Sequence, residues 1–94
     1  MDAQHAAAID IIRDYEEYLD FCFFENKYDI CRLSYARCAA REIINRIKCE
    51  NDISPLDSIE LFKGKMLNFN NIHKRSIFDV GYETANDIID LLMA

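Results

Sequence analysis

Two groups of carboxylates have the residue types and the spacing that a catalytic or metal-binding site could use. They form two short patterns, Glu16-Glu17-x-x-Asp20 and Glu83-x-x-x-Asp87-x-x-Asp90. Acidic residues three or four positions apart share one face of a helix, and carboxylate oxygens can hold Mg²⁺ together with a nucleotide phosphate. One alternative is therefore magnesium-dependent hydrolysis of a nucleotide, which requires Glu17, Asp20, Glu83 and Asp87 to converge.

The paired acidic patterns resemble those of the all-α nucleotide pyrophosphohydrolases of the MazG kind, whose acidic helix motifs bind magnesium. That family places its two motifs much closer together in sequence than they are here. Moreover, the acids of the second pattern lie opposite an apolar helix face that contains Phe78, Tyr82 and Ile89. A solvated acidic surface is the ordinary expectation for such a face, so we predict no catalytic residues here.

The cysteines and histidines do not form a metal-binding pattern. Cys31, Cys38 and Cys49 share one side of a predicted helix, but they lie about 10 Å and about 16 Å apart along its axis, whereas zinc ligands surround one ion at about 2.3 Å. His5 and His73 are single. We predict no metal and no cofactor, and we expect the thiols, with Cys22, to be reduced and buried.

A basic stripe follows the same helix. Its residues share one polar side: Ser34, Arg37, Arg41, Asn45 and Lys48. Arg and Asn side chains read base edges in the major groove, so a nucleic-acid-binding regulator is a second alternative. The formal net charge of −6 disfavours general affinity for phosphate, so we favour the interpretation that the stripe pairs with acidic neighbours.

An apolar stripe on the first predicted helix suggests a protein interface. Ile11, Tyr18, Phe21 and Phe24 point away from the predicted core side, and Ile88 with Leu91 could extend their surface. Aromatic patches rimmed by charge are typical of interfaces. We therefore expect a homodimer or contact with a partner protein; the alternative is that another part of the chain covers the stripe.

The apolar pattern predicts two helices in the first half of the chain. The first spans residues 4–25, with a core side made of Ala8, Ile12, Tyr15, Leu19, Cys22 and Phe23. Polar residues 25–27 mark a break. The second helix spans Tyr28–Cys49 and is apolar on two sides, one containing Leu33, Ala40 and Ile44 and the other carrying the thiols. A helix apolar on two sides is expected at the centre of the fold.

Two start signals predict helices in the second half. Ser54-Pro55-Leu56-Asp57 combines an N-cap, a first-turn proline and an acid three residues after the cap. That helix continues with core residues including Ile59, Phe62 and Met66, and we expect asparagines at 68, 70 and 71 to end it. The last helix starts at Ser76 and repeats Phe78, Tyr82, Ala85, Ile89 and Leu92. Gly81 inside it predicts close approach of a neighbouring helix.

The composition fits one helical domain over residues 1–94. The chain is 51% apolar with two glycines and one proline, which opposes disorder and turn-rich β folds. Net charge alternates along the chain, with −6 over residues 1–29 and +4 over 30–49, which favours pairing of consecutive helices. We predict an all-α fold, a four-helix antiparallel bundle or a close variant. With no signal-peptide or membrane-span pattern, we expect a cytoplasmic protein.

The last forty residues carry a resemblance. Ser54-Pro55-Leu56-Asp57-x-x-Glu60-Leu61-Phe62-x-x-Lys65-Met66 and the segment from Phe78 to Leu92 are similar to small uncharacterised helical proteins of Gram-positive bacteria and their phages and mobile elements. This resemblance implies an accessory protein, and hence an inhibitor that acts by binding, as anti-CRISPR proteins do. Together with the apolar stripe of the first helix, it gives our main hypothesis, a non-enzymatic, acidic, helical protein-binding module that is dimeric or docks on a larger protein through that stripe.

Overall fold

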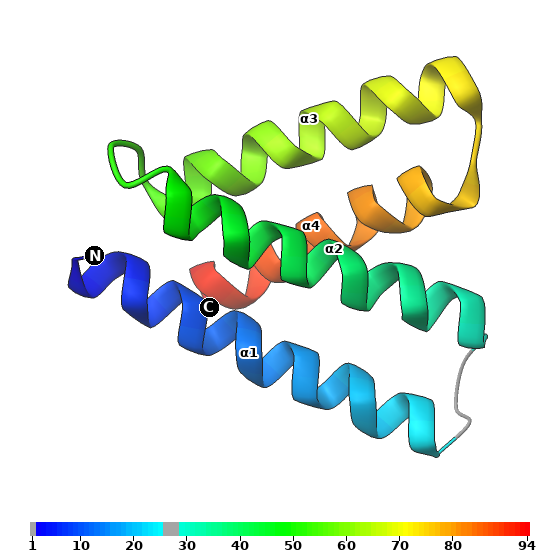
Figure 1. Ribbon diagram of the computed structural model, residues 1–94, viewed down its shortest axis with the longest axis horizontal. Helices are drawn as coiled ribbons and strands as arrows, with labels where there is room; N and C mark the ends of the chain where they lie inside the picture. The colour runs from blue at the N-terminus through cyan, green and yellow to red at the C-terminus, as the bar shows by residue number, and fades with distance from the viewer. Residues whose placement is uncertain (1, 26–28) are drawn as a thin grey trace.

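The computed structural model describes residues 2–25 and 29–94, which form an all-α four-helix bundle (Figure 1). The helices are α1 (Ala3–Phe24), α2 (Ile30–Cys49), α3 (Pro55–His73) and α4 (Ser76–Met93). Consecutive helices run in opposite directions, which confirms the predicted fold class. The break expected at Asn26 and Lys27, and the start of the second helix expected at Tyr28, lie outside the described residues.

Side-chain caps begin the first three helices. The carboxylates of Asp2 and Asp29 accept from the backbone N–H three residues later, and Ser54 Oγ accepts from Asp57 N at 3.1 Å. These bonds satisfy N–H groups that have no partner within the helix. The predicted cap and proline of α3 are thus confirmed.

The end of α3 differs from the prediction. Asparagines at 68, 70 and 71 do not end the helix, which continues to His73. The chain leaves α3 at Lys74, whose φ of 51° is left-handed. Because helices commonly end at a residue in the left-handed conformation, the turn into α4 is set at Lys74 and not at the asparagines.

The core lies around α2 and α4. Its largest fully buried side chains come from all four helices: Ile12, Ile43, Ile47, Ile59 and Ile88. Helix α2 packs against α1 and α4, and α4 packs against α3 as well. The predicted core face of α2, with Leu33, Ala40 and Ile44, is buried, and its alanines leave room for the neighbouring backbones.

Helix α4 is buried on two sides, which corrects one sequence-based assignment. Val80, Thr84 and Ile88 make a second buried row beside the predicted Ala85 and Ile89. Ile88 is 0% exposed, so it cannot extend an interface surface. The reason is that α4 runs between α3 and the α1–α2 pair, where both of its flanks are covered.

The expectation of buried thiols is wrong for three of the four cysteines. Cys22 is buried, whereas Cys31, Cys38 and Cys49 are exposed. Figure 1 shows α3 diverging from α2, so the helices leave the side of α2 near Cys38 uncovered. The thiol side of α2 is therefore surface rather than a second packing face.

The close approach predicted at Gly81 is confirmed. A Cβ atom at this position would lie 2.9 Å from Sδ and 3.1 Å from Cγ of Met66 on α3. Both distances are below ordinary van der Waals contact. Gly81 thus allows α4 and α3 to pack as tightly as they do.

Candidate protein-binding groove between α1 and α4

A groove of about 560 Å³ lies between α1 and α4. It is lined by four apolar or aromatic residues and three carboxylates: Ile11, Tyr15, Tyr18, Leu91, Asp14, Asp87 and Asp90. Figure 1 shows the C-terminal end of α4 close to the first half of α1, with the two helices running in opposite directions. Side chains from the first and the last helix of the chain thus share one opening.

The apolar stripe predicted on α1 is exposed. Ile11, Tyr18 and Phe21 keep between a third and about half of their surface in solvent, and Phe24 is 81% exposed. Leu91 on α4 is 43% exposed and joins Ile11 and Tyr18 in the groove lining. The structure therefore brings two of the four stripe residues, Ile11 and Tyr18, together with Leu91, and it places the predicted Ile88 in the core.

Tyr15 is part of the lining of the groove. The sequence assigned it to the core, and it is in fact half-buried, with its hydroxyl donating to the Asp87 carboxylate over 3.4 Å. Burial, together with the neighbouring charge of Asp87, raises the pKa of the Tyr15 hydroxyl well above its usual value. The hydroxyl therefore remains a proton donor and holds the Asp87 carboxylate at the groove.

Six of the nine carboxylates of α1 and α4 fall into two groups. On the side facing α2, arginines engage them: Asp20 binds Arg37 at 2.8 Å, Glu16 binds Arg41 at 3.1 Å, and Glu83 binds Arg32. On the groove side, Asp14, Asp87 and Asp90 form no ion pair within residues 2–25 and 29–94. Among the described residues, negative charge is therefore neutralised along α2 and left without an ion pair in the groove.

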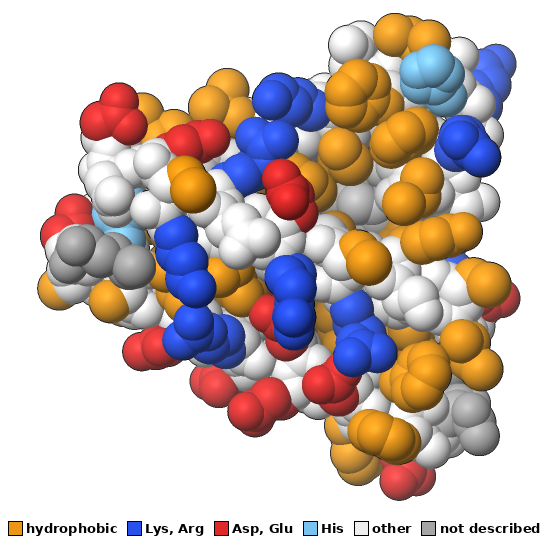
Figure 2. All heavy atoms as spheres, in the orientation of Figure 1, with side chains coloured by type: hydrophobic (Ala, Val, Ile, Leu, Met, Phe, Trp, Pro, Cys, Tyr) orange, Lys and Arg blue, Asp and Glu red, His pale blue; other side chains and the backbone are white. Residues whose placement is uncertain are grey.

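The predicted basic stripe is largely the complement of these acids. Figure 2 shows Lys and Arg side chains along α2 with Asp and Glu side chains beside them over α1. Arg37 and Arg41 make two of these ion pairs, and Arg37 also lies over the Phe23 ring at 5.6 Å. Asn45 and Lys48 are exposed. Only the far end of the stripe thus remains without an acidic partner among the described residues.

The carboxylates needed for magnesium chemistry are engaged separately. Asp20 and Glu83 bind different arginines, Asp87 accepts from Tyr15, and Glu17 is exposed. Over the described part of the chain, no group of three or more His, Cys, Asp or Glu side chains could hold a metal ion. The geometry gives the nucleotide-hydrolysis alternative no support.

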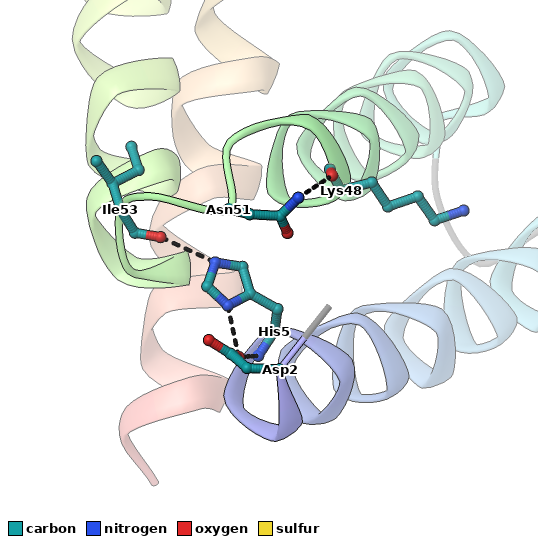
Figure 3. Close-up of polar contacts among 5 residues, drawn as sticks. All are labelled: Asp2, His5, Lys48, Asn51 and Ile53. Carbon is teal, nitrogen blue, oxygen red and sulfur yellow. Dashed lines mark hydrogen bonds and ion pairs between the residues drawn. The ribbon is translucent and has the colours of Figure 1, made fainter.

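A buried polar contact at the N-terminus was missed from the sequence (Figure 3). His5 is 3% exposed; its Nδ1 lies 2.7 Å from Asp2 Oδ1 and its Nε2 lies 2.8 Å from the carbonyl oxygen of Ile53. The imidazole ties the start of α1 to the connection between α2 and α3. The hydrogen bond to Asp2 raises the pKa of His5 against the opposing effect of burial, and the bonds from His5 lower the pKa of Asp2. The Asp2-x-x-His5 spacing, typical of an N-cap, was the available signal.

A second apolar opening lies where α3 diverges from α2. Figure 2 shows apolar side chains gathered on this side of the molecule. The opening is smaller, about 170 Å³, and its lining includes Tyr35, Cys38, Met66 and Phe78. It has one carboxylate, Glu42, where the α1–α4 groove has three. The larger groove therefore offers the more distinctive combination of shape and charge.

Comparisons with protein families, with curated proteins and with solved structures find no match to this chain. Within the described residues, no helix is both long enough and apolar enough to cross a membrane. The resemblance of the last forty residues stays a prediction. The function of the chain must therefore be inferred from the geometry of the groove.

Proposed function

We propose that this chain is a protein-binding module whose binding face is the α1–α4 groove together with the exposed end of α1. The observation that carries the proposal is that Ile11 and Tyr18 of α1 and Leu91 of α4 line one groove of about 560 Å³. Exposed apolar surface with a charged rim is typical of sites where proteins dock. Phe24, near the end of α1, is 81% exposed.

The charge around the groove favours a protein over a nucleic acid. Asp14, Asp87 and Asp90 would repel a phosphate backbone. The arginines that a nucleic-acid-binding regulator would use, Arg37 and Arg41, are held by acidic side chains of α1. Binding without chemistry is also what the predicted role of an inhibitor requires, and that role remains a prediction.

The same charge bears on the predicted homodimer. A two-fold interface places the same patch of both copies face to face, so pairing through this groove would bring the carboxylates of two copies together. Like charges across an interface disfavour association. We therefore favour a different protein as the partner, in the cytoplasm, where the exposed thiols of Cys31, Cys38 and Cys49 would stay reduced.

Site-specific photocrosslinking tests the proposal. A photoreactive phenylalanine analogue replaces Leu91 in the groove or, as a matched control, Leu67 on α3; the two leucines are 43% and 45% exposed. After irradiation in cells of the native host, adducts are separated by mass and identified by mass spectrometry.

We expect a discrete protein adduct from position 91 and none from position 67. An adduct with twice the mass of the 11.0 kDa chain, specific to position 91, would support protein binding and identify a second copy as the partner. No adduct at position 91, or the same adducts at both positions, would contradict the proposal.

A further inference from the structure

We infer that the α1–α4 groove binds an amphipathic helix of the partner that carries Lys or Arg beside its apolar side chains. The inference rests on the proposed function and specifies the chemistry of the partner. Its starting point is that the groove combines an apolar lining with three carboxylates that no described Lys or Arg neutralises.

The shape of the groove suits a helix. It lies between two antiparallel helices, and docking of a third amphipathic helix into such a groove is a recurrent mode of recognition. Ile11 and Tyr18 are seven residues apart on α1, which is about 10.5 Å along the axis. A partner helix with apolar residues at positions i and i+7 has the same spacing. An apolar residue between them, at position i+3 or i+4, would face Leu91.

The charge of the groove selects a basic helix. Helix α1 carries five acidic residues and α4 carries four, against a single arginine, Arg13. The arginines of α2 engage acids that face α2, whereas Asp14, Asp87 and Asp90 line the groove. A Lys or Arg one turn from an apolar anchor would reach these carboxylates, and an acidic helix would be repelled.

Three synthetic peptides test this inference directly. Each is about 20 residues long, because shorter isolated helices are marginal in water. The first has Leu at helical spacing on one face and Lys on the other; the second replaces Lys with Glu; the third replaces Leu with Ser. Binding to the full chain is measured by fluorescence anisotropy at about 0.1 M and about 1 M salt, between which the Debye length falls from about 10 Å to about 3 Å.

We expect the Leu/Lys peptide to bind at least about tenfold more tightly than either of the others, a difference of about 1.4 kcal/mol. Raising the salt concentration should weaken binding of the Leu/Lys peptide without abolishing it, since the apolar contacts remain. Equal binding of the Leu/Lys and Leu/Glu peptides, or of the Leu/Lys and Ser/Lys peptides, would overturn the inference.

Matched variants show whether the peptide uses the groove. Exposed ion pairs each change affinity by up to about fivefold, so Asp87→Asn with Asp90→Asn should weaken the Leu/Lys peptide by about five- to tenfold. The control, Asp52→Asn with Glu60→Gln, removes the same charge from exposed positions outside the groove and should change affinity by less than about twofold. Circular dichroism confirms that each variant is folded.

The outcomes separate this inference from the proposed function. Equal losses in the groove and control variants would show general electrostatic attraction and overturn the inference. A position-91 adduct with no Leu/Lys binding would leave protein binding in place and contradict the basic helix. Absence of both the adduct and peptide binding would contradict both.

Discussion

The two glycines of the chain both lie inside helices, and alanine substitutions at them should affect stability differently. Gly64 lies on the exposed side of α3, where an added Cβ would meet nothing within 4 Å. Gly81 is buried in α4, where the Cβ would lie 2.9 Å from Met66 Sδ. The comparison isolates the contact between α3 and α4 from the intrinsic preference of each helix for alanine.

The magnitudes follow from two opposing effects. Alanine in place of glycine inside a helix gains about 1 kcal/mol of stability, so Gly64→Ala should stabilise the protein by about 0.5–1 kcal/mol. At Gly81 the same gain is offset by overpacking, which costs about 1–3 kcal/mol. Met66 is half-buried and borders the opening between α2 and α3, so it can move aside and the cost should fall in the lower half of that range.

The assay is urea denaturation followed by circular dichroism, with thermal unfolding as a check. We expect Gly64→Ala to raise the free energy of unfolding and the Tm, by about 4–8 °C per kcal/mol for a domain of this size. Gly81→Ala should leave the free energy unchanged or lower it by up to about 1 kcal/mol. Adding Met66→Ala should make the Gly81→Ala substitution less costly, which is the coupling expected of residues in contact. Equal stabilisation by both glycine substitutions would refute the close approach of α3 and α4.

Three further perturbations test other parts of the structure. The stability difference between wild type and His5→Gln, measured by urea denaturation across pH, should be greatest at mildly acidic pH. His5 has a raised pKa, so its contribution to stability is complete below the ordinary value of 6.5 and is lost as pH rises through the folded-state pKa, whereas Asp2, with a lowered pKa, contributes above 3.8 and loses its contribution as pH falls. A stability difference that grew as the pH rose from mildly acidic to alkaline would be inconsistent with the His5–Asp2 contact. Ile88→Ala should destabilise the protein by about 2–5 kcal/mol and Leu91→Ala by less than about 1 kcal/mol, because Ile88 is fully buried and Leu91 is exposed. Comparable losses of stability for the two variants in chemical denaturation would contradict the orientation of α4. The double substitution Arg37→Gln with Arg41→Gln should lower the free energy of unfolding by at most about 2 kcal/mol, because the Arg37–Asp20 and Arg41–Glu16 ion pairs are partly exposed. A larger loss of stability in the same assay would show that the α1–α2 contact depends on these ion pairs.

Much of the fold was predictable because it depends on local patterns. Helical spacing of apolar residues indicated all four helices, and the Ser54-Pro55 signal placed the start of α3. The packing of α4 was harder to predict from the sequence. Ile88 and Leu91 have similar side chains three residues apart, yet one is 0% and the other 43% exposed. Which of them is covered depends on how α4 sits between the other helices, and no local pattern carries that information.

The candidate site was predictable as a stripe and not as a groove. The exposed residues of α1 followed from their position away from the core side, but Asp14 and Tyr15 became part of a site only once α4 was placed beside α1. The thiols illustrate the reverse error. An apolar side of α2 predicted a buried face near Cys38, and the divergence of α3 left it open. Each difference arises from how one helix is placed relative to another, which no local pattern specifies.

The most direct test of the central claim is to map the binding face by nuclear magnetic resonance. The full ¹⁵N-labelled chain is titrated with the Leu/Lys peptide, and amide shifts are followed residue by residue. The groove predicts that the largest shifts cluster around Ile11 to Tyr18 of α1 and Asp87 to Leu91 of α4. Shifts centred instead on the opening between α2 and α3, around Tyr35 and Met66, would contradict binding in the α1–α4 groove.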